Sequence, residues 1–238
     1  WTVAPELPGA LELGDALRAA GIRVSMGHSD ATLEQAREAM DHGYTHLTHF
    51  YSGMSTITRK DGYRIPGLVE AGYLFDKLTV EIIADGKHLP DSLLQLVYRS
   101  KGPAKTVLIT DAMRGAGQTE GRTILGSLSS GQECWIEDGV AKMPDRKAFA
   151  GSVATADRLV RNMVELAGAP LTDAVRMMTL TPARLFGIRK RGSLRPGMRA
   201  DLAVFDGGIR MEATVSEGAI IYQRGTDENE TRFYLSGR

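Results

Sequence analysis

Four separate apolar, β-branched segments of this chain each end on a residue that can bind a metal ion or transfer a proton. The four segments are Ile22–His28, Tyr44–His49, Thr79–Asp85 and Thr106–Asp111. Buried strands that end repeatedly in His or Asp bring those side chains together at one rim of a parallel sheet, where barrel enzymes keep their chemistry. The pattern therefore predicts a hydrolytic metal site.

Helical and strand-like segments alternate through the first two thirds of the chain. Amphipathic helices are predicted over Leu11–Ala20 and Ala31–His42, with Ser29 or Asp30 as the cap of the second, and each ends at a glycine that leads into a strand. A further helix beginning near Pro90 separates the last two strands. This spacing predicts right-handed parallel βαβ units and an α/β fold of the (β/α) TIM-barrel type.

The number of strands is too small for a closed barrel. A complete barrel typically takes about 250 residues, whereas this chain of 238 residues shows four clear strands and a candidate fifth at Trp1–Ala4. We therefore expect only the C-terminal half of a barrel, over residues 1–190, cut from a longer protein. In such a half-barrel, apolar strand residues are expected to lack packing partners, which predicts a homo-oligomer. The residues concerned are Val24, Leu47, Ile82 and Leu108.

The pattern changes after Asp111. A hairpin is predicted over Cys134–Met143, followed by helices from about Ser152 to Ala167 and from Asp173 to about Leu180. The tail, 191–238, is expected to form a small β unit that completes a β domain beside the barrel. Its predicted short strands are Leu194–Gly197, Asp201–Asp206 and Ile220–Gly225.

Composition argues against several classes of partner. Lys+Arg and Asp+Glu both number 29, so nothing in the charge balance calls for nucleic acid. The single cysteine, Cys134, cannot form an internal disulfide, and no apolar run is long enough to span a bilayer. With no signal peptide visible, we expect a cytoplasmic protein without a membrane partner.

The five histidines differ in their expected roles. His28 and His49 end strands that are separated by one βα unit, so their side chains are expected to meet and bind a metal. His46 lies three residues before His49 and should face the opposite side of its strand, in a structural position. His42, at a helix end, suits the helix dipole. For His88, after a strand, a substrate contact and an ordinary exposed position both remain open.

Asp111 is either a turn-forming residue or a proton-transfer group. An apolar strand leads directly into it and a glycine-rich loop follows, which favours general acid/base chemistry beside a metal. The basic residues Arg59, Lys60 and Arg64 form either a solvated loop or an anion clamp, and composition does not separate these readings.

Taken in order, the strand-end motifs resemble those of a known family. Gly27-His28-Ser29, Thr48-His49, Ala84–His88, Thr110-Asp111-Ala112 and Gly151-Ser152 are similar to the successive motifs of the N-acetylglucosamine-6-phosphate deacetylases of the amidohydrolase superfamily. The segment Gly192–Ala203 is similar to the one that leads many amidohydrolases into their small β domain. The resemblance covers nearly the whole chain.

The resemblance implies a metal-dependent hydrolysis of the acetamide of an amino-sugar 6-phosphate, with release of acetate. The implied cofactor is a divalent cation, with Zn²⁺ expected, held by His28 and His49. Asp111 is implied as general base and then general acid, and His88 as a substrate-binding residue that helps to hold the developing oxyanion.

The implied phosphate contacts depart from the family pattern. Ser52 and Gly53 stand where the family usually has Asn-Ala, and Arg64 lies in a segment similar to the family's Arg-Glu-Pro-Gly. The family's early His-x-His strand and its metal-binding Glu are expected upstream of the present residues, and Glu6 occupies a different position. The alternatives are an inactive fragment, which alone would neither bind zinc tightly nor release acetate, and an amidohydrolase acting on another amide.

Overall fold

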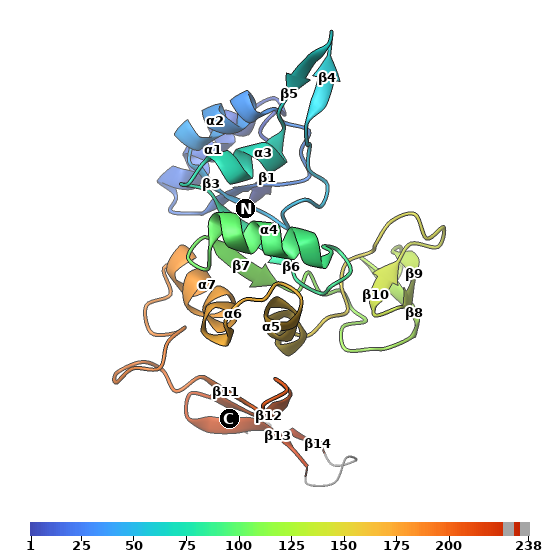
Figure 1. Ribbon diagram of the computed structural model, residues 1–238, viewed down its shortest axis with the longest axis vertical. Coiled ribbons are helices and arrows are strands. Elements are labelled where there is room, and N and C mark those ends of the chain that lie inside the picture. The colour runs from blue at the N-terminus through green and yellow to red at the C-terminus, as the bar shows by residue number, and fades with distance from the viewer. Residues whose placement is uncertain (226–230, 234–238) are drawn as a thin grey trace.

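A five-stranded parallel sheet lies at the centre of the computed structural model, which describes residues 1–225 and 231–233 (Figure 1). Its strands follow one another in chain order and every neighbouring pair is parallel. They are β1 Thr2–Val3, β2 Val24–Met26, β3 Tyr44–Leu47, β6 Thr79–Ile83 and β7 Thr106–Ile109. The predicted α/β class and the candidate first strand are confirmed. Over the described residues the sheet stays open, with β1 and β7 at its edges.

Helices connect successive strands of this sheet. They are α1 Ala10–Ala19, α2 Leu33–Asp41, α3 Leu68–Leu74 and α4 Asp91–Lys101. The predicted cap of α2 is wrong: Thr32 caps it, because Thr32 Oγ1 accepts from Gln35 N and the Gln35 side chain accepts from Thr32 N. Ser29 and Asp30 instead donate to the Glu6 carboxylate, at 2.7 Å each.

The helices cover the apolar side chains of the strands. Leu47 and Ile82 are completely buried in one core cluster with residues of α2 to α4 and of the later helices. Val24 and Leu108 belong to the same cluster. The expectation that these four residues lack partners is therefore wrong, because the helical layer already covers them. Self-association of the chain stays a prediction, without support from these side chains.

A small hairpin precedes α3 and was not expected. Its strands β4 Thr58–Lys60 and β5 Tyr63–Ile65 are antiparallel, and it stands out at the top of the molecule (Figure 1). The two residues between the strands, Asp61 and Gly62, both have positive φ, of 47° and 87°. Asp-Gly at such a turn is a strong hairpin signal, which the polar character of the segment masked.

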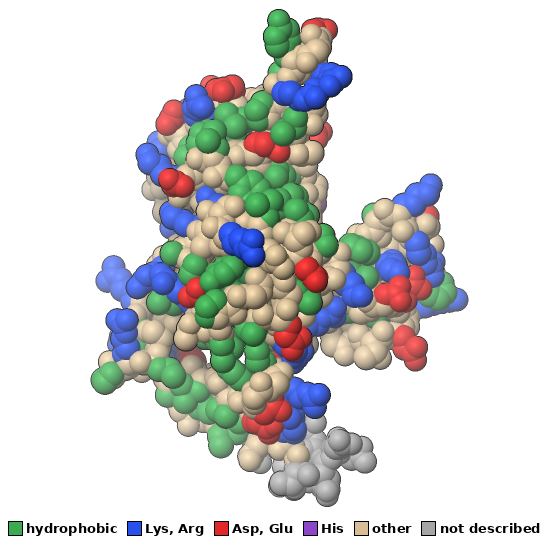
Figure 2. All heavy atoms as spheres, viewed as in Figure 1, with side chains coloured by type: hydrophobic (Ala, Val, Ile, Leu, Met, Phe, Trp, Pro, Cys, Tyr) green, Lys and Arg blue, Asp and Glu red, His purple; other side chains and the backbone are tan. Residues whose placement is uncertain are grey.

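A three-stranded antiparallel sheet follows β7 and projects from the body of the molecule (Figures 1 and 2). Its strands are β8 Gly121–Leu125, β9 Gln132–Glu137 and β10 Val140–Lys142. The predicted hairpin over Cys134–Met143 is confirmed by the pairing of β9 with β10, whereas β8 was not expected. Cys134 and Ile136 are buried in a small core of this arm.

The remaining chain forms three helices and a four-stranded antiparallel sheet. Their bounds are α5 Ala156–Glu165, α6 Leu171–Met178, α7 Leu180–Leu185, β11 Leu202–Phe205, β12 Met211–Ser216, β13 Ala219–Arg224 and β14 Thr231–Phe233. The predicted strands over Asp201–Asp206 and Ile220–Gly225 are confirmed. The predicted strand at Leu194–Gly197 is wrong, since Pro196 offers no amide hydrogen and Gly197 has φ of 82°.

Helix α5 carries the contact between this C-terminal sheet and the rest of the molecule. The Arg161 guanidinium donates to the carbonyl oxygens of Gly208 and Ile209, at 3.0 and 2.7 Å. The division at residues 190 and 191 stays a prediction, and the unit 191–238 extends beyond the described residues. No helix in the described part of the chain is long and apolar enough to cross a membrane.

Ile82 offers a test of the packing of the central sheet. Because its side chain is completely buried between strands and helices, Ile82→Ala should lower the free energy of unfolding by about 2–5 kcal/mol. Ile57→Ala is the matched control, because Ile57 is 53% exposed and exposed substitutions usually change stability by less than about 0.5 kcal/mol. Urea unfolding followed by circular dichroism measures both. Equal losses would contradict the assigned core.

Candidate active site

Three residues at strand ends adopt a left-handed backbone conformation. His28, His49 and Asp111 have φ values of 48°, 33° and 47°. This region is uncommon for residues other than glycine, and such conformations cluster at functional sites, where the surrounding structure must hold them. The turn at each strand end directs the side chain toward a common cavity, since all three residues line it.

The His28 and His49 side chains meet edge to face. Their Nε2 atoms are 2.9 Å apart, and the ring planes are 88° apart. Two imidazole lone pairs at this distance repel each other unless a proton or a cation lies between them. Two zinc ligands at tetrahedral angles lie roughly 3.3 Å apart, so the pair fits a shared divalent cation after a small adjustment. The His49 Nδ1 atom is buried and has no partner in the described structure.

The strand end that carries His49 is fixed by a buried polar group on β6. The Glu81 carboxylate accepts from the His49 backbone N–H, at 3.3 Å, and pairs with His46 Nε2, at 2.8 Å. His46 Nδ1 lies 2.6 Å from Thr79 Oγ1. His46 is buried and does not line the cavity, in agreement with its predicted structural position.

The loop that carries His28 is held by the segment after β3. Ser29 N donates to Gly53 O at 2.9 Å, and Ser55 N donates to Ser29 O at 3.0 Å. Gly53 has φ of 58°, and a Cβ added there would lie 3.1 Å from His28 Nδ1. Because Gly53 has no side chain, this loop can approach His28 closely.

His88 is oriented by Asp85. The Asp85 carboxylate accepts from the backbone N–H groups of Lys87 and His88, and its second oxygen lies 2.8 Å from His88 Nδ1. Burial by itself raises the pKa of Asp85, but the hydrogen bonds from His88 and Lys87 outweigh it and hold the pKa below its usual value. An ionised Asp85 only accepts, so His88 Nδ1 carries a proton and Nε2 remains for a ligand.

Helix α5 supports the loop that carries Asp85. Arg158 Nη2 donates to Asp85 O at 2.6 Å, and Asn162 Nδ2 donates to Ala84 O at 2.9 Å. A Cβ added at Gly86 would lie 3.3 Å from Asn162 Nδ2, so this turn approaches the helix closely. The sequence assigned α5 to the core and gave no signal for this polar support.

Asp111 is held through its backbone, and its side chain is exposed in the cavity. Ser152 N donates to Asp111 O, and Met113 N donates to Ser152 O, both at 2.9 Å. Gly151 has φ of 81°, and a Cβ there would lie 3.0 Å from Asp111 O. The Asp111 carboxylate has no hydrogen bond or ion pair within the described residues, so it is available to a ligand.

The cavity has a volume of about 630 Å³ and two unlike walls. The polar wall carries the residues expected at the site, namely His28, His49, Ser52, Gly53, His88 and Asp111. The sequence did not indicate the apolar wall, which consists in particular of Leu125 on the unexpected strand β8 and of Met113 and Phe149 in the segments before β8 and after β10. The Phe149 and His88 rings lie 4.9 Å apart between centroids.

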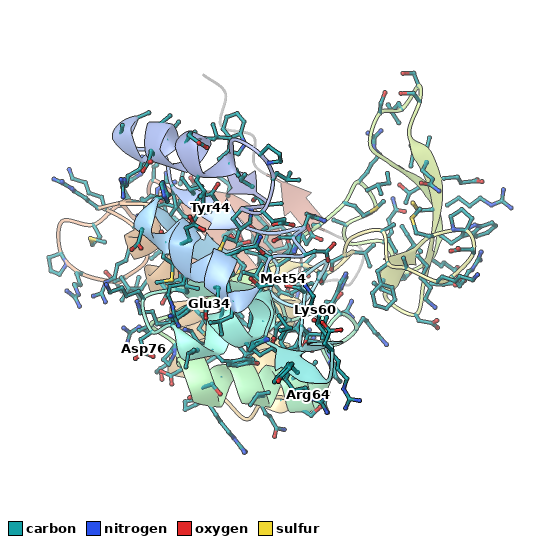
Figure 3. All side chains as sticks on the ribbon, turned by 90° about the horizontal axis from the view of Figure 1, so that it is seen from above. Glu34, Tyr44, Met54, Lys60, Arg64 and Asp76 are labelled. Atoms are coloured by element: carbon teal, nitrogen blue, oxygen red, sulfur yellow. The ribbon has the colours of Figure 1, made fainter. Side chains whose placement is uncertain are left out.

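Arg64 is placed away from this cavity. It lies on β5, exposed, and does not line the cavity. Arg59 and Lys60 share the hairpin, and Lys60 and Arg64 lie near each other in the view from above (Figure 3). A phosphate contact by Arg64 stays a prediction. The described residues also contain no group of three or more His, Cys, Asp or Glu side chains that could hold a metal.

Comparison with known proteins identifies the family of this chain. The model of the amidohydrolase family matches residues 6–237, so the chain belongs to the amidohydrolase family. It is 37% identical over 219 residues to N-acetylgalactosamine-6-phosphate deacetylase of Escherichia coli O157:H7, covering 92% of this chain and 55% of that protein. It is 34% identical over 222 residues to N-acetylglucosamine-6-phosphate deacetylase of Lysinibacillus sphaericus, covering 93% and 55%.

Solved structures agree with these relatives. The chain is similar to a mutant N-acetylglucosamine-6-phosphate deacetylase of Mycobacterium smegmatis in complex with N-acetylglucosamine 6-phosphate, with a TM-score of 0.84 and 34% identity, covering 92% of this chain and 56% of that one. The enzyme from Thermotoga maritima gives a TM-score of 0.84 at 31% identity, covering 93% and 58%. The chain therefore spans about half the length of the relatives it matches.

Asp85→Asn tests the orientation of His88. At neutral pH the substitution should cost about 1.5–3 kcal/mol of stability, the usual worth of a hydrogen bond to a charged group. Because the folded-state pKa of Asp85 is depressed, the wild-type advantage is complete above the unfolded pKa of about 3.9 and is lost as pH falls through the folded pKa. Urea unfolding between pH 2 and 7 measures the difference, with the exposed Asp76→Asn as control. A difference that does not change with pH would contradict the assignment.

Proposed function

We propose that this chain carries the catalytic residues of a metal-dependent deacetylase that hydrolyses the acetamide of an amino-sugar 6-phosphate and releases acetate. The observation that carries the proposal is the convergence of His28, His49 and Asp111 in one cavity, each on a left-handed turn at a strand end. Relatives named as deacetylases of two epimeric amino-sugar phosphates support the substrate class. The sugar epimer is left open by them.

The proposed metal ligands are His28 and His49. Divalent-metal dependence is general in the amidohydrolase superfamily, and Zn²⁺ suits imidazole nitrogen ligands. Catalytic zinc usually has three protein ligands, whereas the described residues supply two at this point. We therefore propose that another polypeptide segment supplies the remaining ligand. A divalent cation bound here polarises the amide carbonyl and lowers the pKa of a water molecule.

Asp111 and His88 have different proposed roles in the reaction. Asp111, exposed and unpaired in the cavity, takes the proton of the attacking water and then delivers it to the leaving nitrogen. His88 directs Nε2 to the substrate, because Asp85 occupies Nδ1. When the ring is doubly protonated, Nε2 donates to the carbonyl oxygen and stabilises its developing charge.

Other residues are proposed to contact the phosphate and the acyl methyl group of the substrate. Ser52 and Gly53 are proposed to contact the sugar phosphate. The apolar wall of Met113, Leu125 and Phe149 fits a small acyl methyl group and excludes water from it. Arg64 is proposed as a further phosphate contact from the exposed hairpin, outside the cavity lining. A cytoplasmic location stays a prediction from the sequence.

Asp111→Asn tests the proposed acid/base. The assay uses a form of the protein that releases acetate from N-acetylglucosamine 6-phosphate. In that form the substitution should lower turnover by roughly 10²–10⁴, the usual contribution of a positioned acid/base. The metal should stay largely bound, because the proposed ligands are His28 and His49. The matched control is Asp61→Asn, on the exposed hairpin turn. Unchanged turnover in Asp111→Asn would remove this residue from the mechanism.

Zinc titration of the present chain tests the proposed ligands. Two imidazoles should bind zinc weakly, so atomic absorption after dialysis should find much less than one zinc per chain. Isothermal titration should show weak binding that His49→Ala abolishes and His42→Ala leaves intact, because His42 pairs with Asp15 away from the cavity. Zinc retained at one per chain, together with measurable acetate release, would show that the chain already holds a complete site. Binding unaffected by His49→Ala would refute the ligand assignment.

A further inference from the structure

A second cavity lies at the opposite end of the central sheet. Its volume is about 360 Å³, and its lining includes Arg23 and Lys105, which directly precede β2 and β7. The candidate active site instead lies beyond the ends of the same strands, at His28 and Asp111. Helices α6 and α7 close one side of the second cavity.

Five cationic side chains line this cavity and no carboxylate does. The cations are Arg23, Lys77, Lys105, Arg176 and Arg184, and Thr45, Thr79 and Thr181 add hydroxyl groups. The chain as a whole has a formal net charge of zero. Concentrating five positive charges around one cavity is unfavourable unless a bound anion offsets their repulsion.

None of the five cations forms an ion pair with a carboxylate in the described part of the chain. Elsewhere in the chain, by contrast, Arg161 pairs with Asp157 at 3.0 Å and Arg191 pairs with Asp201 at 2.8 Å. Asp76, next to Lys77 in the chain, lies outside the cavity lining and acts electrostatically on Lys101. The positive charge of the cavity is therefore not neutralised within the chain.

Arg176 adds an unmet hydrogen-bond donor. Its Nε atom is buried and has no partner among the described residues. The threonine hydroxyls of the cavity do not accept from it: Thr79 Oγ1 donates to Thr45 O at 3.2 Å, and Thr181 Oγ1 donates to Pro103 O at 2.6 Å. A buried donor without an acceptor costs about 1–3 kcal/mol, a cost that an oxyanion bound in the cavity would remove.

We propose that this cavity binds a phosphoryl group, with Arg176 and Arg184 as its principal contacts. Phosphoryl oxygens match the planar, multiple-donor guanidinium group, and a dianion suits several cations at once. The site is distinct from the proposed deacetylation cavity. The linings of the two cavities share no residue, and Thr45 lies within β3 whereas His49 lies beyond its last residue, Leu47.

Isothermal titration of the whole chain with inorganic phosphate and with glycerol 3-phosphate tests the proposal. The experiment is run at pH 7.5 and constant ionic strength, with chloride as the background anion. We expect saturable binding of one phosphoryl group per chain, and a rise in the melting temperature with ligand concentration. Tighter binding of glycerol 3-phosphate would identify a phosphate monoester as the ligand, and tighter binding of phosphate would identify the free anion.

Charge-removing variants locate the site. Arg176→Gln and Arg184→Gln should each weaken binding by about tenfold or more. Arg99→Gln is the matched control, an exposed arginine outside the cavity that should bind like wild type. The double variant with His28→Ala and His49→Ala should also bind like wild type. Circular dichroism checks that each variant folds. If Arg176→Gln unfolds, Arg184→Gln still tests the site, because Arg184 is exposed and its replacement should not disturb the fold.

Three results would overturn the proposal. The first is the absence of saturable binding, and the second is an equal effect of Arg99→Gln and Arg184→Gln. The third is loss of binding in the His28→Ala and His49→Ala variant, which would place the phosphoryl group in the other cavity.

Discussion

The left-handed turns that follow β2, β3 and β7 are the constraint on which the candidate site depends. An extended strand alternates its side chains between two faces, and only a sharp backbone turn after the last paired residue directs His28, His49 and Asp111 to one cavity. Each turn is held by hydrogen bonds from another segment, such as Ser152 N to Asp111 O. The site therefore belongs to the sheet and its connections together, and not to any one loop.

Polar groups outside the cavity lining hold the turns that carry the site residues. Glu81 holds the backbone of His49, Asp85 holds His88, and Arg158 holds the loop of Asp85 from helix α5. Buried polar groups are costly unless all their hydrogen bonds are made. For His88 this support commits Nδ1 to Asp85 and leaves Nε2 for the cavity, whereas Glu81 holds His49 through its backbone N–H.

The two ends of the sheet have opposite chemical character. The carboxyl ends collect imidazoles and a carboxylate, which suit a cation. At the amino ends, three cations that precede strands and two from helices α6 and α7 line a cavity that suits an anion. Parallel strands allow this separation, because every strand contributes its first residues to one end and its last residues to the other. The scaffold can therefore hold two sites without direct contact between them.

The sequence by itself determined four strands of the central sheet and the residues of the polar wall. β-branched runs ending in His or Asp define β2, β3, β6 and β7. These runs, and the glycines that end the helices before β2 and β3, are local properties of the chain. Motif order likewise pointed to the amidohydrolase family, which the match over residues 6–237 bears out. Roles for the individual site residues remain proposals.

Only the tertiary structure decided which side chains share a cavity. The facing Nε2 atoms of His28 and His49 and the support of Asp85 by α5 join residues from separate segments, and no local pattern encodes those contacts. The same holds for the exclusion of Arg64 from the cavity, because the hairpin that carries it leaves the body of the molecule. Local chemistry fixes strands, helices and turns, whereas the distances between them follow from how the helical layer packs on the sheet.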